Sequence, residues 1–543
     1  MSAVIGISFG NTSSSIAVAT QDGKVDVIAN PDGDRAIPSV LSYVGADEYH
    51  GAQAKAQLIR NPKNTIINFR DLIGKNFDDA DVSGSKYGAP AVKLDDGKIG
   101  YQITRDNGNI ETVTVAEATK RHMLQMKVAA EDYIGKKVEG VVITVPTDFH
   151  AHQREELTKI VNDAGLKVLQ MINEPSAALL AHLSAEESRL TEDKLYVVAD
   201  FGGVRSDAAV IAARGGVFTI LATAHKHGLG GDLLDDALAE YFAKEFEKKK
   251  KTNPRTNARS LAKLKAESIT VKKTLSNVQT STCSIDSLAE GFDFHTTINR
   301  LRYELTARSV LSDMTSFIES VVTKAGLENL DIDEVLLVGG TSHTPKLASN
   351  VSFVFPESTV IVSPALDSKA LNPEELVCRG AALQASMVES FDEEEIKESL
   401  QPVVVNTQHL SKSIGIKDAE GNFTPILVAE TAYPIKKSIE VTNGSSTSVV
   451  IDLYEGHRTV KETVIEAEKY SDDEEDDYSD EEPEVKKEIV YVPGTLLAQL
   501  PIKDLKPNSK LEVIVNITHD GTLHVSGREL KQGSVAVKGE IQA

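Results

Sequence analysis

The sequence is poor in cysteine, with only Cys283 and Cys378 among its 543 residues. Two thiols that form no metal-like pair exclude a secreted scaffold held together by disulfides. Long apolar runs are also missing, so we expect no segment that crosses a bilayer. The first residues enter an apolar strand pattern without a basic segment or a cleavage site, which predicts no secretory leader and a cytoplasmic location.

Basic residues are fewer than acidic residues. Lys and Arg together number 58, Asp and Glu number 81, and the formal net charge is -23. This balance argues against direct nucleic-acid binding as the main function, because such binding needs a basic surface. The 543 residues also exceed the roughly 250–300 that a single core usually supports, so we expect two to four domains.

Short apolar runs end in glycine-rich turns. The runs Val4–Gly10, Leu195–Gly203 and Val335–Thr341 predict buried strands. Between such runs, apolar residues recur at helical spacing, as they do along Leu261–Leu275. Strands that alternate with helices indicate an α/β fold. Because the first two strand–turn units are alike and lie far apart in the chain, we expect a duplicated domain with two lobes around a cleft.

The chain lacks the Gly-Lys-Ser/Thr of a Walker-type phosphate loop at the required spacing. Its glycine turns nevertheless suit phosphates, which bind backbone N–H groups presented by small residues in tight turns. The candidate turns are Gly10–Ser14, Gly202–Gly203, Gly230–Gly231 and Gly339–Thr341. A single turn of this kind usually only reverses the chain, but several of them favour a nucleotide site.

The composition changes near Asp392, and we expect a linker over residues 392–407. Beyond it, short runs such as Ser448–Tyr454 and Leu511–Ile517 predict a β-rich domain over residues 408–543. Within this domain, the acidic stretch at residues 471–483 repels itself and cannot bury apolar surface, which predicts a disordered loop.

A series of motifs resembles the 70-kDa heat-shock chaperone family, and the resemblance extends as far as Ser526. The motifs also occur in the order that this family shows, which makes a chance match negligible. The matching stretches are Gly6–Thr12, Val142–Pro146, Ile172–Ala178, Val198–Gly203, Leu229–Asp232, Ile285–Phe294, Val338–Lys346, Asn372–Glu375 and Gly380–Ala382.

The resemblance implies an actin-like, two-lobed ATP-binding domain over residues 1–391, followed by the linker and a β-sandwich of the peptide-binding type. ATP would lie between the lobes, and whether Mg²⁺ accompanies it stays open. The residues that the resemblance places around ATP are Gly10, Asn11, Thr12, Ser13, Arg70, Asp200, Gly202, Gly203, Gly230, Gly231, Lys272, Lys273, Ser276, Gly339, Gly340 and His343.

Several departures from the family pattern fall near the γ-phosphate. This chain has Ser8 where the family has a metal-positioning aspartate, and Arg70 where it has an essential lysine. A neutral hydroxyl cannot orient the hydration shell of a metal ion, and arginine does not replace lysine conservatively at a crowded site. The next glycine and threonine of the second turn appear as Val204 and Arg205, and we expect Val204 to crowd the γ-phosphate.

The adenine end also departs, with His343 in place of a stacking arginine and Ile269 in place of a glutamate. Asp200 and Glu174, in contrast, match the family pattern. Because phosphoryl transfer depends on positioning and charge stabilisation, losing several such groups predicts ATP binding with weak or absent hydrolysis. We therefore assign no catalytic residue and no metal ligand.

The second half departs as well. After Ser526 the sequence holds only Gly527–Ala543, for which we expect a turn and a short strand but no helical lid. Without a lid, a bound peptide would dissociate quickly. The family's leucine-rich linker appears here as Pro402–Asn406, which puts communication between the domains in doubt.

Together these departures resemble the atypical family member of the fungal ribosome-associated complex. That resemblance implies a stable heterodimer with a zuotin-like J-domain protein, which would supply most of the ribosome contact. The pair would stimulate a second, active heat-shock chaperone on nascent polypeptides. The β-domain would bind a segment of its partner by strand addition.

Two other functions stay open at this point. An active folding chaperone with a full ATP cycle is one, although Ser8 and Arg70 speak against it. A nucleotide-exchange factor of the larger heat-shock relatives is the other, although those relatives carry a long C-terminal helical extension. A sugar kinase on the same actin-like fold has no place for the β-rich tail.

Overall fold

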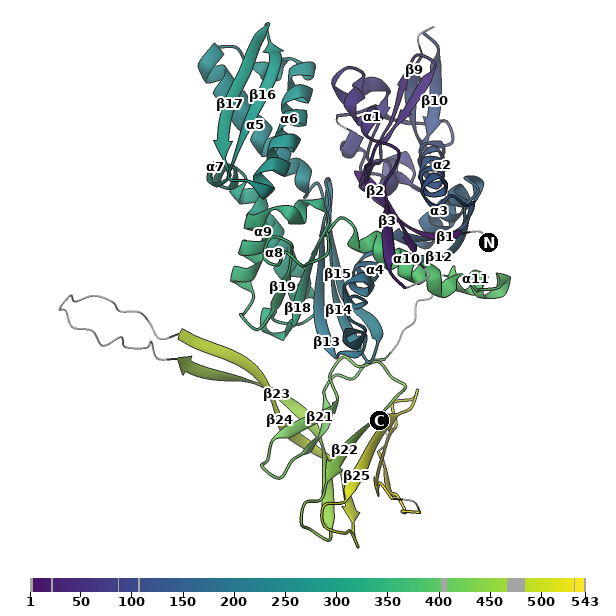
Figure 1. Ribbon diagram of the computed structural model, residues 1–543, viewed down its shortest axis with the longest axis vertical. Helices are drawn as coiled ribbons and strands as arrows, with labels where there is room; N and C mark the ends of the chain where they lie inside the picture. Colours follow the sequence, from purple (N-terminus) through teal and green to yellow (C-terminus); the bar gives the residue numbers. More distant parts are fainter. Residues whose placement is uncertain are drawn as a thin grey trace, which may run out of the picture. The chain divides into compact units, whose positions relative to one another are not determined.

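The structure is a computed structural model that describes residues 3–20, 23–85, 87–105, 108–401, 408–465, 484–531 and 533–541 (Figure 1). The chain divides into two compact units. The first contains residues 1–190, 196–211 and 220–403, and the second contains residues 404–543 with the short segments 191–195 and 212–219. Each unit is considered by itself below.

The first lobe of unit 1 is built on a mixed sheet with the strand order β12-β11-β1-β2-β3, and β4 pairs with β2. β1 is parallel to β11, which is parallel to β12, whereas β2 runs antiparallel to β1 and β3. Ile5, Ile7 and Phe9 of β1 are fully buried in the core of this lobe. The strands are β1 (Ala3–Phe9), β2 (Ser13–Ala19), β3 (Val25–Ile28), β4 (Ile37–Pro38), β11 (Val138–Val145) and β12 (Lys167–Asn173).

The second lobe repeats this arrangement with the order β15-β14-β13-β18-β19. Three consecutive strands are again followed by two strands that add in parallel, β18 on β13 and β19 on β18. This repetition confirms the predicted two-lobed α/β fold. The strands are β13 (Lys194–Phe201), β14 (Arg205–Arg214), β15 (Val217–His227), β18 (Glu334–Val338) and β19 (Val360–Val362).

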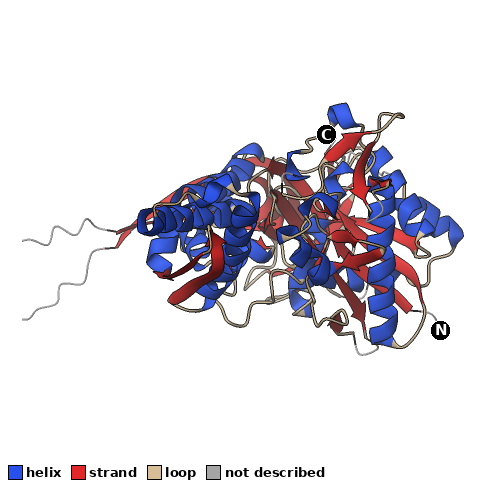
Figure 2. Cartoon of the chain, turned by 90° about the horizontal axis from the view of Figure 1, so that it is seen from above, coloured by secondary structure: helices blue, strands red, loops and turns tan. Residues whose placement is uncertain are grey.

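Helices and three smaller sheets complete unit 1, and Figure 2 shows the helices packed along the outside of the strands. The small-sheet strands are β5 (Leu41–Val44), β6 (Asp47–His50), β7 (Thr65–Ile66), β8 (Ala91–Lys93), β9 (Ile99–Thr104), β10 (Ile110–Thr114), β16 (Thr280–Ala289) and β17 (Phe292–Asn299). The helices are α1 (Gly51–Ala56), α2 (Val115–Ile134), α3 (Ala151–Asp163), α4 (Glu174–Leu183), α5 (Gly231–Lys250), α6 (Ala258–Asn277), α7 (Arg300–Thr306), α8 (Arg308–Lys324), α9 (Pro345–Val354), α10 (Leu376–Val388) and α11 (Glu393–Ser399).

Local sequence sets the ends of the long helices. The Thr114 hydroxyl accepts a hydrogen bond from the backbone N–H of Glu117 at 3.0 Å and so caps the start of α2. Gly135 ends α2 in the left-handed conformation, with φ of 70°. The Asn257 side chain caps α6 in the same way as Thr114 caps α2. The Asn257 cap fixes the start of α6, and this helix carries several candidate site residues.

Unit 2 contains two four-stranded sheets, ordered β21-β20-β23-β24 and β22-β25-β26-β27. Apolar side chains of both sheets, among them Leu453, Leu511 and Val513, form one core, as expected for a β-sandwich. The predicted β-rich domain is therefore present. Its strands are β20 (Ile414–Lys417), β21 (Phe423–Leu427), β22 (Ile435–Thr442), β23 (Val449–Ile465), β24 (Glu484–Ile502), β25 (Lys510–Ile517), β26 (Leu523–Glu529) and β27 (Val537–Ile541).

The first part of the predicted linker is helical: residues 393–399 form helix α11, which Asp392 caps. The rest of it, residues 402–407, lies outside the described residues, as does the acidic stretch 471–483. From residue 408 onward, the described residues form strands and connecting turns without a helix.

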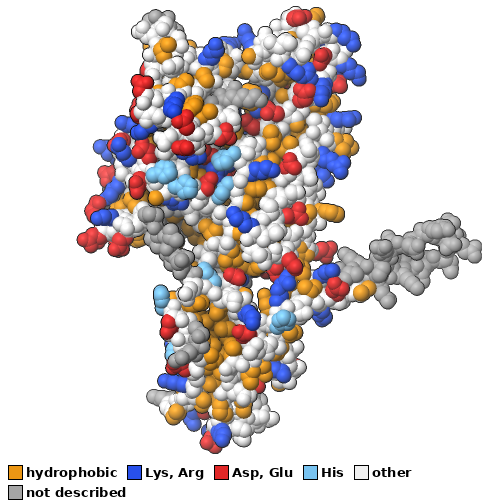
Figure 3. Space-filling view, turned by 180° about the vertical axis from the view of Figure 1, so that it is seen from behind, with side chains coloured by type: hydrophobic (Ala, Val, Ile, Leu, Met, Phe, Trp, Pro, Cys, Tyr) orange, Lys and Arg blue, Asp and Glu red, His pale blue; other side chains and the backbone are white. Residues whose placement is uncertain are grey.

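No helix among the described residues has the length and apolar character needed to cross a membrane. On the face drawn in Figure 3, Lys and Arg side chains are interspersed with Asp and Glu over unit 1.

One close helix crossing yields a test of the fold. A Cβ atom at Gly380 in α10 would overlap the backbone carbonyl oxygen of Ala177 in α4, so Gly380→Ala must push the two helices apart. We expect this change to lower the free energy of unfolding by about 3 kcal/mol. Urea denaturation followed by the helical circular dichroism signal measures it, because all described helices belong to unit 1.

The matched control is Met387→Ala in the same helix, since Met387 is 57% exposed and its truncation costs little. Equal midpoints for Gly380→Ala and the wild type would contradict the tight crossing.

Candidate nucleotide-binding site

A cavity of about 520 Å³ lies between the two lobes of unit 1. Glycine turns from both lobes, the start of α5 and one face of α6 surround it. It gathers all but one of the residues that the sequence nominates. Those that line it are Gly10, Asn11, Thr12, Ser13, Arg70, Asp200, Gly202, Gly203, Gly231, Lys272, Lys273, Ser276, Gly339, Gly340 and His343.

The first turn, between β1 and β2, has its carbonyls held away from the cavity by Ser39. The Ser39 hydroxyl donates to the Gly10 carbonyl at 2.8 Å, and the Ser39 backbone N–H donates to the Thr12 carbonyl at 3.1 Å. Within the described ranges, the backbone N–H groups of Asn11 and Thr12 donate no hydrogen bond. The turn therefore offers backbone donors to a ligand, as an anion-binding nest does.

The second turn, between β13 and β14, has the same property. The carbonyls of Gly202 and Gly203 accept hydrogen bonds from the backbone N–H groups of Gly231 and Asp232 at 2.9 and 2.8 Å. In the part of the chain that is described, the backbone N–H groups of Gly203 and Val204 donate to no acceptor. The two lobes thus present equivalent sets of donors to the cavity, as the duplication predicts.

Gly230 is the nominated residue that does not line the cavity. A Cβ atom here would overlap the carbonyl oxygen of Gly203, so this glycine is needed to let the start of α5 approach the second turn. Its role is to support that turn. Gly203 is also confined, since its Cβ would lie 2.5 Å from a side-chain atom of Thr12 across the cleft.

Helix α6 forms the far end of the cavity. Lys272 Nζ lies 2.8 Å from the Asp235 carboxylate and donates to the Gly231 carbonyl at 3.0 Å. Lys272 is therefore fixed toward the interior and is not part of a solvated helix face. Ile269 contributes an apolar side chain to the lining, and the short helix after β18 contributes His343.

The floor of the cavity is charged and buried. Arg70 donates from Nη1 to Glu174 Oε1 at 2.8 Å and to the Phe9 carbonyl at 3.0 Å, and from Nε to Asp71 Oδ1 at 2.9 Å. The Arg70 side chain is only 6% exposed. The charge of Arg70 is thus already engaged by protein carboxylates.

Burial shapes the ionisation of this floor. Burial raises the pKa of Glu174 to about 8, and the nearby Arg70 opposes this only in part. Burial and the neighbouring Asp207 raise the pKa of Asp200 to about 7. Burial would also raise the pKa of Asp71, but Arg70 and Arg205 outweigh it and hold that pKa well below its usual range. Asp200 and Glu174 are therefore partly protonated near neutral pH.

A chain of buried side chains supports the first turn from behind. Ser39 Oγ lies 2.9 Å from Ser14 Oγ, and Ser14 Oγ lies 3.0 Å from Nε2 of His122. Burial lowers the pKa of His122 to about 3, so its imidazole is neutral. The Ser39 hydroxyl donates its proton to the Gly10 carbonyl, so it can only accept a hydrogen bond from the Ser14 hydroxyl. The Ser14 oxygen in turn accepts a hydrogen bond from the Nε2–H group of His122. His122 was not nominated, since nothing in the sequence connects it with Ser14.

The structure adds further lining residues that sequence reasoning missed. One of them carried a signal, because Asp207 follows Arg205 by two positions and therefore shares its face of strand β14. Glu374 lies within the motif Asn372–Glu375, whereas the remaining residues lie outside the matching stretches. The added residues include Asp34, Lys55, Asp207, Asp235 and Glu374.

Comparison with known proteins agrees with this geometry. The family described as "Hsp70 protein" matches residues 4–471. The ribosome-associated complex subunit SSZ1 of Saccharomyces cerevisiae is 54% identical over 544 residues, which cover 99% of this chain and 100% of that protein. A heat shock protein 70 homolog of Schizosaccharomyces pombe is 44% identical over 99% of this chain and 95% of its own length.

More distant relatives match over a similar extent. Heat shock 70 kDa protein 14-A of Xenopus laevis is 30% identical, over 98% of this chain and 98% of its own length. Because the family match spans most of the sequence and the duplicated lobes enclose the glycine-lined cavity, the chain belongs to the Hsp70 family.

Proposed function

We propose that this chain is an atypical, cytoplasmic Hsp70-type subunit of a ribosome-associated complex, which binds ATP without significant hydrolysis. It pairs stably with a J-domain protein, which supplies most of the ribosome contact. The pair stimulates an active heat-shock chaperone during the folding of nascent polypeptides. The full-length similarity to a relative named as a ribosome-associated complex subunit supports the assembly part of this proposal.

The ATP-binding part rests on one observation, the two facing turns whose backbone N–H groups donate to no protein acceptor within the described ranges. Such donors suit the phosphates of a nucleotide. They belong to the backbone, so the substitutions at Ser8, Arg70 and Arg205 do not remove them. A bound nucleotide would stabilise the closed arrangement of the lobes by mass action.

The side chains support the proposed absence of significant hydrolysis. Ser8 brings a neutral hydroxyl to the cavity, and Arg70 is held by Glu174 and Asp71. A Mg²⁺ ion that came with the nucleotide would be held through Asp200, which lines the cavity, and would neutralise phosphate charge. With a neutral Ser8 and an engaged Arg70, the groups that orient the attacking water and the γ-phosphate are not in place.

Calorimetry and single-turnover hydrolysis test binding and chemistry separately. The wild type should bind ATP and hydrolyse it at least about 100-fold more slowly than an active relative measured alongside. Gly203→Ala should weaken binding about tenfold or more, because its Cβ meets the Thr12 side chain at 2.5 Å. Gly84→Ala is the control, since its Cβ makes an ordinary 3.5 Å contact with Asn68.

Lack of any ATP binding by the wild type would refute the ATP-binding proposal. Rapid ATP turnover would instead favour the alternative function, an ATP-cycling folding chaperone.

The raised pKa values of Asp200 and Glu174 predict how ATP affinity depends on pH. Both carboxyls are neutral below their pKa values, about 7 and about 8, and become negative as pH rises through them. In metal-free buffer, the affinity for ATP should therefore fall by about tenfold from about pH 6 to about pH 9. Binding isotherms of the wild type and of Asp200→Asn measure this dependence.

The asparagine side chain stays neutral at every pH, so this variant should show a flatter profile. Identical profiles for the two proteins would exclude Asp200 as the titrating group.

The partner part of the proposal is tested by purification. Among the described residues of the second unit, β21 and β24 are the terminal strands of one sheet and β22 and β27 those of the other, and a partner segment would add to one of these strands. The tagged full chain, isolated from its native cytosol at moderate salt, should carry a J-domain protein in equimolar amount. An active Hsp70 relative treated in the same way should carry far less, and recovery of this chain alone would reject the heterodimer.

A further inference from the structure

Arg205 is the first residue of β14, and its side chain is buried, with only 5% of it exposed. Its Nε donates to Asp207 Oδ2 at 2.6 Å, its Nη1 to Asp71 Oδ2 at 3.2 Å and its Nη2 to Asp148 Oδ1 at 2.8 Å. A buried charge is tolerated only when it is paired and hydrogen-bonded, and these three carboxylates meet that condition.

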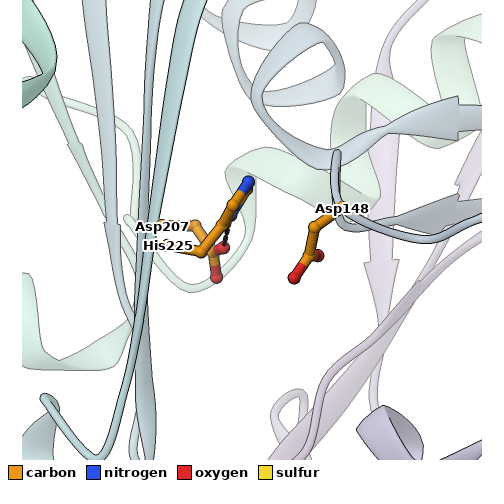
Figure 4. Close-up of side chains that lie close together, drawn as sticks. All are labelled: Asp148, Asp207 and His225. Carbon is orange, nitrogen blue, oxygen red and sulfur yellow. Dashed lines mark hydrogen bonds and ion pairs between the residues drawn. The ribbon is translucent and has the colours of Figure 1, made fainter. Parts of the chain in front are cut away.

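The partners of Arg205 come from both lobes. Asp207 lies on the same strand of the second lobe, whereas Asp71 and Asp148 belong to the first lobe, in the turn after β7 and in the turn after β11. Figure 4 shows Asp207 and His225 together on one side and Asp148 facing them from the other side. The guanidinium therefore spans the floor of the cleft from one lobe to the other.

The same place has the chemistry of a cation site. Asp148, Asp207 and His225 offer ligand atoms that all lie within 4.8 Å of one another. A single atom, Nη2 of Arg205, donates to both carboxylates and lies 3.3 Å from His225 Nδ1. A nitrogen of the guanidinium thus occupies the point where the three potential ligands converge.

Removing this side chain would change the local charge balance. Asp148 and Asp207 would then face each other across the cleft without the cation between them, and like charges in a partly buried site repel each other. Asp71 would keep Arg70 at 2.9 Å and His227 at 3.5 Å, so it would lose only one of its cationic partners. Among the described residues, Asp207 would keep as a partner only His225, whose Nδ1 lies 2.6 Å from Asp207 Oδ1. Asp148 and Asp207 are therefore the groups that depend most on Arg205.

We infer that Arg205 is a built-in cation: it takes the place of a metal ion among Asp148, Asp207 and His225 and holds the two lobes of unit 1 together across the floor of the cleft. The inference does not depend on the proposed function, because it concerns the protein without nucleotide. It assigns to Arg205 a positioning role and predicts that its removal exposes a divalent-cation site.

Electron paramagnetic resonance of added Mn²⁺ tests the cation part on the nucleotide-free full chain. Arg205→Ala should bind one more Mn²⁺ ion per chain than the wild type, and Arg205→Lys, which keeps a cation, should not. Adding Asp207→Asn to Arg205→Ala should abolish the gain. No extra Mn²⁺ on Arg205→Ala overturns the cation part, and so does a gain that survives Asp207→Asn.

Arg255→Ala is the matched control, because Arg255 also pairs with two carboxylates, Glu240 and Glu247, but on the outside of the second lobe. This variant should bind no more Mn²⁺ than the wild type. An equal gain there would show that loss of any arginine suffices, which also overturns the inference.

Spin labels on the two lobes test the closure part. Cysteines introduced at the exposed positions Asp95 and Gln279 can be labelled while the native Cys283 and Cys378 stay buried. Without nucleotide or metal, Arg205→Ala should broaden and lengthen the distance distribution, whereas Arg205→Lys should stay close to the wild type. A distribution for Arg205→Ala identical to that of the wild type overturns the closure part.

Discussion

Charge buried between two lobes has to be paired, and this constraint governs the floor of the cleft. Arg70 and Arg205 are both almost fully buried, and each is surrounded by carboxylates. Asp71 contacts both guanidinium groups and so links the two sets of pairs. Removing one member of a buried pair leaves the other charge uncompensated, which destabilises a fold by about 3–5 kcal/mol. The arginines and acids of the floor therefore act as a single unit.

This pairing bears directly on the chemistry that the cleft can perform. A cation that stabilises a transferring phosphoryl group has to be available to that group when charge develops on it. Arg70 instead directs its nitrogens to Glu174, Asp71 and a backbone carbonyl. The engagement of Arg70 by protein groups therefore supports the proposed absence of significant hydrolysis.

The proposed nucleotide binding depends on a different part of the structure. The donors of the two turns are backbone groups, held in place because their carbonyls are tied back, by Ser39 in the first lobe and by Gly231 and Asp232 in the second. The departures from the family pattern at Ser8 and Arg70 do not involve these atoms. A site of this kind can lose its catalytic groups and keep its affinity for phosphate, since the two properties reside in different atoms.

The sequence by itself determined the elements and the turns. Apolar runs ending in glycine located β1, β13 and β18, and the likeness of the first two units indicated two lobes. The nominated ATP-site residues came from the resemblance of the ordered motifs to the 70-kDa heat-shock chaperone family, whereas the residues alone indicated only candidate phosphate turns. These inferences succeeded because each depends on residues that are neighbours in the chain.

Tertiary structure decided the rest. Gly230 supports the second turn and does not line the cavity, and His122 supports the first turn from 108 positions away. Only the folded chain reveals that Arg205 meets Asp148 and Asp71, at separations of 57 and 134 positions. Neither periodicity nor residue spacing indicates a pairing between distant segments, because such a pairing depends on how the two lobes face each other in the folded chain.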